Sequence, residues 1–254
     1  MASVISICNQ KGGVGKSTTA VNLGSYLAIS GKKVLVIDLD SQGNATICCG
    51  IDRTTIQKTI YDGIRHNADL PSLVIKSVVP SMDVIPSSIE LADLDAELAG
   101  QQGRESLLKQ RIESLQSLYD VIVFDCPPSL GLITLSALTA SDGVLIPVQC
   151  EYLAMEGLNS LLKTVDRVRN NFNPRLKILG IVLTMADFRT SLSQEVAGEV
   201  KSFFKDLVMT TSIPRNVRLA ESPSFGRPIC LYDPESTGAI AYSNLAKEFL
   251  GKMS

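Results

Sequence analysis

The sequence predicts an α/β protein built on a doubly wound, mostly parallel sheet that is flanked by helices. Three observations support this fold class. Short apolar runs alternate with longer stretches of helical periodicity, most of these runs are continuously rich in Val, Ile and Leu, and a glycine-rich loop follows the first of them. Continuous apolar strands are typical of a parallel sheet that is covered on both faces. Sites in such folds lie at the carboxyl ends of the strands.

Seven apolar runs are predicted as strands because they are short, rich in β-branched residues and bounded by polar or turn-forming residues. In chain order they lie at 4–8, 34–38, 82–85, 121–125, 144–148, 179–184 and 208–212. The stretches between them repeat apolar residues at helical spacing. They predict helices at 16–30, 90–98, 104–118, 132–139, 155–170, 192–206 and 237–250. Gly31 is a typical helix stop, and Pro174 follows another helix end by four residues.

All of these elements fit one domain spanning residues 1–254, because the chain has no internal repeat and no linker-like segment. The net charge of −2 gives no general attraction to nucleic acid. No apolar run approaches the roughly 18–20 residues that a membrane span needs, and we expect no signal peptide ahead of the first strand. Six scattered cysteines without a CxxC pair favour reduced core residues over a disulfide framework or zinc site. The protein is therefore expected to be cytoplasmic.

The glycine-rich loop between the first strand and the first helix is typical of a phosphate-binding loop. Its glycines let backbone amides curl around an anion, the helix N-terminus adds partial positive charge, and Lys16 adds a full charge. Ser17 places a hydroxyl where Mg²⁺ would lie between the β- and γ-phosphates. Gln10 replaces the usual first glycine, and the phosphates alone do not require Lys11. We expect a nucleotide to be bound by Lys11, Gly12, Gly13, Val14, Gly15, Lys16, Ser17 and Thr18.

Aspartates follow two predicted strands at the ends where chemistry is expected. Asp125 ends an apolar run, as in a Walker B strand whose aspartate holds Mg²⁺ through water. Asp40 is placed to orient the attacking water and is a second candidate for a water-mediated metal contact. A lone aspartate after a strand usually caps a turn, but the upstream loop favours function for both, while both interpretations stay open for Asp38. His66, the sole histidine, is interpreted as a solvated loop residue.

These motifs in combination resemble one family. Residues 11–18 match the deviant Walker A motif of the ParA/MinD ATPases, within the SIMIBI class of P-loop proteins. Further motifs at 38–46, 125–131, 147–152 and 213–226 are similar to those of the chromosomal ParA (Soj) branch. The resemblance extends over nearly the whole chain.

This resemblance implies an ATPase that binds ATP and Mg²⁺ and forms a sandwich homodimer with two nucleotides at its interface. Lys11 matches the signature lysine that reaches the partner's phosphates, Lys16 the Walker lysine, and Asp40 the water-positioning aspartate. A cation supplied by the partner stabilises transition-state charge and couples dimerisation to the nucleotide state. The adenine side is expected to include Thr184, Met185, Pro214, Arg215 and Asn216.

The resemblance also implies DNA segregation, in which the dimer binds double-stranded DNA non-specifically and a ParB-type centromere-binding partner stimulates an otherwise slow hydrolysis. Arg189 and Arg218 match arginines implicated in DNA binding in this branch. Residues 151–230 hold 11 Lys/Arg and 8 Asp/Glu, whereas residues 1–150 hold 11 and 15. A solvated helix face explains most such charges, but phosphate contacts add up in a dimer. We therefore expect a nucleoid-associated protein that is not attached to a membrane.

Three alternatives remain at this stage. A MinD-like membrane-cycling ATPase needs a C-terminal amphipathic helix, and the tail after Asn244 has a small apolar face for that purpose. An iron–sulfur ATPase needs cysteines grouped at a dimer axis, and Cys126 has no second cysteine in a recognisable partner motif. A nucleotide-dependent scaffold without hydrolysis is disfavoured by Asp40.

Overall fold

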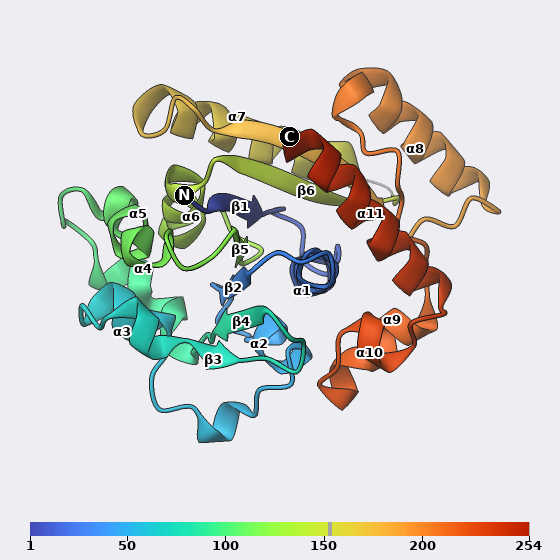
Figure 1. Ribbon diagram of the computed structural model, residues 1–254. Coiled ribbons are helices and arrows are strands. Elements are labelled where there is room, and N and C mark those ends of the chain that lie inside the picture. The colour runs from blue at the N-terminus through green and yellow to red at the C-terminus, as the bar shows by residue number, and fades with distance from the viewer. Residues whose placement is uncertain (152–153, 254) are drawn as a thin grey trace.

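The computed structural model describes residues 1–151 and 154–253, and over this part of the chain it has one seven-stranded sheet with the order β3-β4-β2-β5-β1-β6-β7. Figure 1 shows the sheet between helical layers. The pairs are parallel, apart from β3 and β4 at one edge. The strands are β1 (Ser3–Ile7), β2 (Val34–Asp38), β3 (Ile75–Lys76), β4 (Met82–Ile85), β5 (Val121–Asp125), β6 (Gly143–Gln149) and β7 (Lys177–Thr184). The predicted fold class is confirmed.

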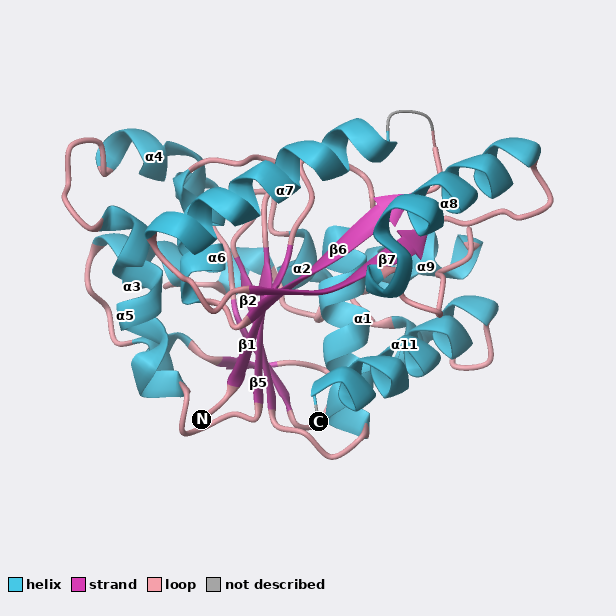
Figure 2. Cartoon of the chain, turned by 90° about the horizontal axis from the view of Figure 1, so that it is seen from above, coloured by secondary structure: helices cyan, strands magenta, loops and turns pink. Residues whose placement is uncertain are grey.

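The helices cover both faces of this sheet, and Figure 2 shows α5, α6 and α7 on one side and α1 and α11 on the other. They are α1 (Lys16–Ile29), α2 (Asn44–Cys48), α3 (Ile60–Arg65), α4 (Leu94–Glu97), α5 (Leu107–Arg111), α6 (Leu132–Ala140), α7 (Ala154–Asn171), α8 (Ser191–Phe204), α9 (Val217–Glu221), α10 (Ile229–Tyr232) and α11 (Thr237–Met253). Gly31 has a φ of 89° just after α1, which confirms the predicted stop. Among the described helices, none is long and apolar enough to cross a membrane.

The strands bury apolar side chains on both faces, which explains their continuous apolar runs. Alternate residues of β5 pack in opposite directions, Ile122 and Phe124 toward the α5–α7 side and Val121 and Val123 toward the α1 and α11 side. All four are 0–1% exposed. A parallel sheet is stable when helices cover both of its faces in this way. The six predicted strands that correspond to β1, β2 and β4 to β7 are therefore confirmed.

The predicted strand at 208–212 is wrong. This segment lies beside β7 but makes only an isolated bridge there, through the amide of Met209. The amides of the next two threonines turn away and donate to the carboxylate of Glu248 in α11, at 2.7 and 2.9 Å. The ladder resumes at Ile213, whose amide donates to the carbonyl of Leu183 at 2.8 Å. Glu248 thus takes the donors that a regular strand would give to the sheet.

Two predicted helices, 90–98 and 104–118, are broken into short α and 3₁₀ turns. Leu108, Ile112 and Leu115 are nevertheless buried at helical spacing. The apolar period that predicted the second helix is real, but packing against α6 rather than continuous helical hydrogen bonding holds the segment. Short helices such as this are stabilised mainly by tertiary contacts.

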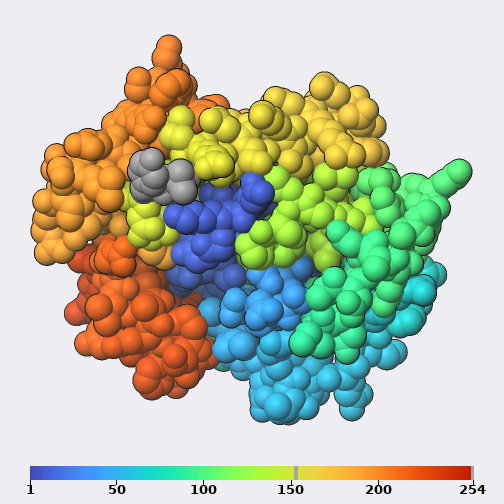
Figure 3. All heavy atoms as spheres, turned by 180° about the vertical axis from the view of Figure 1, so that it is seen from behind, coloured from blue at the N-terminus to red at the C-terminus, as the bar shows by residue number. Residues whose placement is uncertain are grey.

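The order of the strands places the site. The chain passes from β1 toward one edge through β2 and returns to the other edge through β6, so the direction of winding reverses beside β1. Ligands in open α/β sheets bind at such a switch point, outside the carboxyl ends of the strands. In Figure 3 the N-terminal segment, in blue, reaches the surface in the middle of one face and is bordered there by segments from much later in the chain.

Candidate nucleotide-binding site

The loop after β1 has the conformation of an anion cradle. Gly13 and Gly15 have φ values of 73° and 87°, which side chains with a Cβ rarely adopt. Gly15 is the N-cap of α1, and its carbonyl accepts the amide of Thr19 at 2.8 Å. The first amides of α1 therefore lack partners within the helix and, with the helix dipole, favour a bound phosphate.

Contacts with two other strands hold this loop in place. The Asn9 amide donates to the carbonyl of Pro147 in β6 at 2.6 Å, and its oxygen accepts the backbone N–H of Lys11 at 3.0 Å. The hydroxyl of Thr184, at the end of β7, donates to the carbonyl of Val14 at 2.8 Å. Thr184 therefore shapes the loop as well as lying beside it. The role of Asn9 was not anticipated, because its partner is 138 residues away.

The two lysines of the loop lie in different environments. Lys16 is 6% exposed, and its ammonium group donates to the carbonyl of Lys11 at 3.2 Å. Burial lowers the pKa of Lys16, and the nearby Asp125 and Asp40 carboxylates partly offset this effect. The Lys11 side chain is 39% exposed, and its ammonium group lies 3.5 Å from a carboxylate oxygen of Glu151. Lys16 thus faces into the site, whereas Lys11 lies at its rim.

The register of the sheet brings the two strand-end aspartates together. Asp38 of β2 pairs directly with Asp125 of β5, and both are 0% exposed. Asp38 has partners, because its carboxylate accepts the amide and hydroxyl of Thr46 at 2.8 and 2.7 Å and the amide of Asp40 at 3.2 Å. Burial raises the pKa of Asp38 to about 6 despite these bonds. Both oxygens of the Asp38 carboxylate thus accept hydrogen bonds from nearby donors, as those of a structural cap do.

The carboxylate of Asp125, unlike that of Asp38, is buried without hydrogen-bond partners of regular geometry. Both of its carboxylate oxygens are buried and neither has a hydrogen-bond partner of regular geometry. Burial, followed by the charge of Asp38, raises the pKa of Asp125 well above its usual range, although the Ser17 hydroxyl and Lys16 favour the ionised form. An orphaned buried carboxylate facing a serine hydroxyl fits a hydrated Mg²⁺ that also contacts phosphate. Ser17 and Asp125 are therefore the residues that fit the predicted metal site.

Asp40 lies on the phosphate side with a restrained backbone. It is 7% exposed, and its carboxylate accepts the amide of Gln42 at 3.0 Å. Its carbonyl accepts a short hydrogen bond from the hydroxyl of Ser87. One carboxylate oxygen remains for another contact, so the residue can hold a water or a hydrated ion.

Two adjoining cavities form the cleft, and they share Gly15, Thr18 and Met185. The phosphate end is about 340 Å³ and is lined by Gly12, Gly13, Lys16, Ser17, Asp40, Gln42, Asn44, Cys48, Pro128 and Pro223. The other end is about 280 Å³ and is lined by Thr184, Ile213, Pro214, Arg215, Asn216, Leu219, Ala220 and Tyr242. All five residues predicted for the adenine side line this second end. Sequence reasoning missed Leu219, Ala220 and Tyr242, which lie on short or distant helices.

Two residues of the adenine end have unusual local structure. Met185 adopts a φ of 47°, a strained conformation that is frequent at functional sites. The Asn216 side chain is already bonded at both ends, since its oxygen caps α9 through the amide of Leu219 and its nitrogen donates to Thr237. With its amide used in this way, Asn216 shapes the cavity chiefly as a helix cap.

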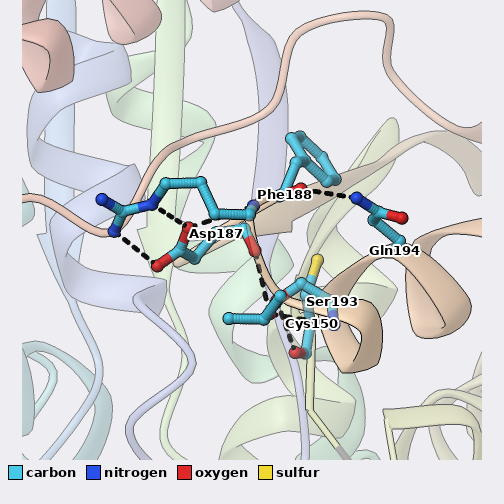
Figure 4. Close-up of polar contacts among 7 residues, drawn as sticks. Cys150, Asp187, Phe188, Ser193 and Gln194 are labelled. Carbon is cyan, nitrogen blue, oxygen red and sulfur yellow. Dashed lines mark hydrogen bonds and ion pairs between the residues drawn. The ribbon is translucent and has the colours of Figure 1, made fainter.

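The two predicted DNA-binding arginines lie outside the cleft and are paired with carboxylates. Arg189 is 89% exposed in its side chain and makes two contacts of 2.7 Å with Asp187. Figure 4 shows dashed contacts that end on the carboxylate of Asp187. The Arg189 guanidinium lowers the pKa of Asp187 to about 2. Arg218 contacts Glu221 at 3.0 Å and Asp233 at 3.3 Å. Both cations are exposed, but neither is free of a local counter-charge.

The six cysteines, which all lie in the described part of the chain, form no disulfide, and five of them are buried. Cys126 is fully buried against Cys8, directly beneath the site. Burial raises the pKa of Cys126 well above its usual range. Its position inside the core is unlike that of a cysteine displayed on a surface for a cluster shared between subunits.

The fold and the cleft together define a P-loop nucleotide-binding protein of the doubly wound class. A family model described as an AAA domain matches residues 2–178. The sporulation initiation inhibitor protein Soj of Bacillus subtilis is 52% identical over 248 residues, which cover 98% of this chain and 98% of that protein. The chromosome partitioning protein ParA of Caulobacter vibrioides is 46% identical over 251 residues, covering 98% and 94%. The chain therefore belongs to the ParA/Soj family of chromosome-partitioning ATPases.

A solved structure shares the whole fold. Cobyrinic acid a,c-diamide synthase from Mycobacterium smegmatis, with bound ATP analog and magnesium, matches with a TM-score of 0.86 and 35% sequence identity. The match covers 98% of this chain and 95% of that chain. The Soj and ParA relatives confirm the predicted family, and this solved structure of the same fold holds an ATP analog and magnesium.

Exchanging each buried aspartate for asparagine is predicted to have opposite effects on the nucleotide-free protein. Asp125→Asn removes a buried carboxylate that has no hydrogen-bond partner of regular geometry and whose burial Lys16 only partly compensates, so it should raise the free energy of unfolding by about 1 kcal/mol. Asp38→Asn places an amide against the donors of Thr46 and should lower it by about 1–2 kcal/mol. Urea denaturation without nucleotide measures both values, and a less stable Asp125→Asn protein would contradict the assignment. The Asp125 variant should also lose the Mg²⁺-dependent part of its stabilisation by ATP.

Proposed function

We propose that this protein is an ATP-dependent DNA-segregation ATPase that works as a nucleotide-bound sandwich dimer. In this proposal the dimer binds double-stranded DNA without sequence preference, in the cytoplasm at the nucleoid. A ParB-type centromere-binding protein then stimulates hydrolysis of ATP and releases the DNA. Membership of the ParA/Soj family supports this cycle.

The observation that carries the proposal is the different placement of the two loop lysines. Lys16 is buried in the phosphate end of the cleft, where it serves the nucleotide of its own subunit. Lys11 is held by its backbone to Asn9 but keeps a partly exposed ammonium group at the rim. A cation at that position is available to the phosphates of a second subunit that faces the cleft. Supplying it across the interface couples dimerisation to the presence of the γ-phosphate.

The remaining roles follow from the geometry of the phosphate end. Asp40 would hold the attacking water, since it lines this cavity and has a free carboxylate oxygen. Ser17 and Asp125 would hold Mg²⁺, with Asp125 acting through water and Asp40 as a further water-mediated contact. The bound metal neutralises phosphate charge. Catalysis of this kind depends on positioning and charge stabilisation by the protein's own groups.

For DNA binding we propose Arg189 and Arg218, which are exposed cations in the later half of the chain. Their ion pairs with Asp187, Glu221 and Asp233 are exposed. Exposed pairs of this kind are weak, so phosphate groups can compete with the carboxylates for the guanidinium groups. Two arginines in each subunit give four such contacts in a dimer, which favours DNA binding by the dimer over the monomer.

The structure of α11 argues against the membrane-cycling alternative. Tyr242, Leu245, Ala246 and Phe249 are buried, and they belong to the same apolar cluster as residues of α1. The Tyr242 hydroxyl also lies 3.1 Å from that of Thr19. The apolar face of this helix is therefore used within the protein, whereas an interfacial anchor must offer such a face to lipid.

Lys11→Ala is predicted to retain ATP binding but to lose the ATP-dependent dimer, because it removes the rim cation while leaving Lys16 in place. Lys16→Ala is the matched control and should lose ATP binding itself. Titration with a fluorescent ATP analogue measures binding, and size-exclusion chromatography with Mg²⁺–ATP measures dimerisation. A Lys11→Ala protein that still dimerises as the unmodified chain does would refute the role in trans.

Changing Arg189 and Arg218 together to Glu is predicted to remove DNA retention while the ATP dimer persists. A gel shift at fixed low salt measures retention. Each lost phosphate contact should also lower the slope of log binding constant against log salt concentration by about one. The control changes Arg65 and Lys76 to Glu, because both are ion-paired surface cations near the opposite edge of the sheet. If the two double variants bound DNA equally well, the DNA-binding surface would have to lie on other residues.

A further inference from the structure

Glu151 joins three side chains at the mouth of the cleft. One carboxylate oxygen lies 3.5 Å from the Lys11 ammonium group. The other lies 3.4 Å from the Arg215 guanidinium and accepts the Gln149 amide at 2.5 Å. Glu151 lies two residues after β6, and its amide donates to the carbonyl of Gln149, the last residue of that strand, at 2.8 Å. The carboxylate therefore bridges the front of the phosphate loop and the loop that lines the adenine end.

The bridge made by Glu151 lies between α7 and the adenine end of the cleft. A methyl group on Gly157 of α7 would lie 4.0 Å from the Cβ of Lys11, so α7 runs beside the front of the phosphate loop. Asn9 holds the Lys11 backbone, which leaves the side chain as the part that can move. Arg215 lines the adenine end of the cleft. The Lys11 ammonium group is thus held within its own subunit, at the rim where a second subunit would approach.

We infer that Glu151 is a positioning residue that holds Lys11 within its own subunit and so raises the concentration at which the ATP dimer forms. This inference rests on the proposed function, in which Lys11 contacts the partner's phosphates. The lysine cannot reach across the interface while it contacts Glu151. Dimerisation must therefore exchange a carboxylate for a phosphate at Lys11 in both subunits.

The ion pair between Lys11 and Glu151 is weak enough for a phosphate to replace the carboxylate. The side chains of Lys11 and Glu151 are 39% and 42% exposed, and an exposed ion pair of this length is weak. A phosphate in a closed interface offers more negative charge and less competing water. Glu151 is not left unpaired by the exchange, because Arg215 and Gln149 remain beside it. The contact thus sets a threshold that the nucleotide can overcome.

Glu151→Gln tests the inference, since it removes the charge and keeps the shape. The nucleotide-free monomer is treated with an acylating reagent, and mass spectrometry measures the labelling rate of Lys11. We expect labelling to be about twofold to fivefold faster in the variant, because the amine no longer contacts a carboxylate. Sedimentation with Mg²⁺ and a slowly hydrolysed ATP analogue then measures the dimer dissociation constant. We expect it to fall about fivefold, since two weak pairs no longer need to break.

Glu97→Gln is the matched control, because Glu97 also forms a partly exposed pair, with Arg65, away from the cleft. It should change neither measurement. Adding Lys11→Ala to Glu151→Gln should abolish the gain in dimerisation, which separates release of the lysine from a general charge effect. Unchanged labelling of Lys11, or an unchanged or weaker dimer beside a normal wild-type dimer, overturns the inference. Faster labelling with no dimer of either chain would instead overturn the proposed function.

Discussion

The structure depends on two opposite charges buried at the point where the winding of the sheet reverses. Asp125 has no hydrogen-bond partner of regular geometry, and Lys16 loses most of its contact with water. Each is costly to bury alone, and together they only partly compensate. A phosphate group with a hydrated cation supplies what both lack. The glycine conformations of the phosphate loop and the hydrogen bonds of Asn9 and Thr184 hold the loop so that Lys16 lies near Asp125 at the phosphate end of the cleft.

Elements far from the loop shape the rest of the cleft. The carboxylate of Glu248 in α11 diverts the segment after residue 208 from the sheet, and that segment then supplies the adenine end. Tyr242 of the same helix reaches both the adenine end and Thr19 of α1. At the rim, Glu151 links the phosphate loop to Arg215. The nucleotide site is therefore bordered by contacts from α11 and from the segment after β6.

Local patterns were enough to predict six strands, the phosphate loop and the aspartate at the end of β5. These features rest on short-range chemistry, namely continuous apolar runs, glycine spacing and strand-end carboxylates. The errors arise where distant residues intervene. The strand expected at 208–212 loses its donors to Glu248. The helix cap that Asn216 provides, in addition to lining the cleft, was not foreseen because its helix is too short to show a period. The register that makes Asp38 a capping residue beside Asp125 also becomes visible only in the folded sheet.

The central claim is that Mg²⁺ and the γ-phosphate together complete the buried site and thereby allow two chains to pair. Sedimentation velocity of the unmodified protein tests it most directly. Four samples are compared: no nucleotide, Mg²⁺–ADP, a slowly hydrolysed ATP analogue with Mg²⁺, and the same analogue with chelator. A dimer is expected in the third sample and monomers in the other three. The same sedimentation coefficient in all four would contradict it.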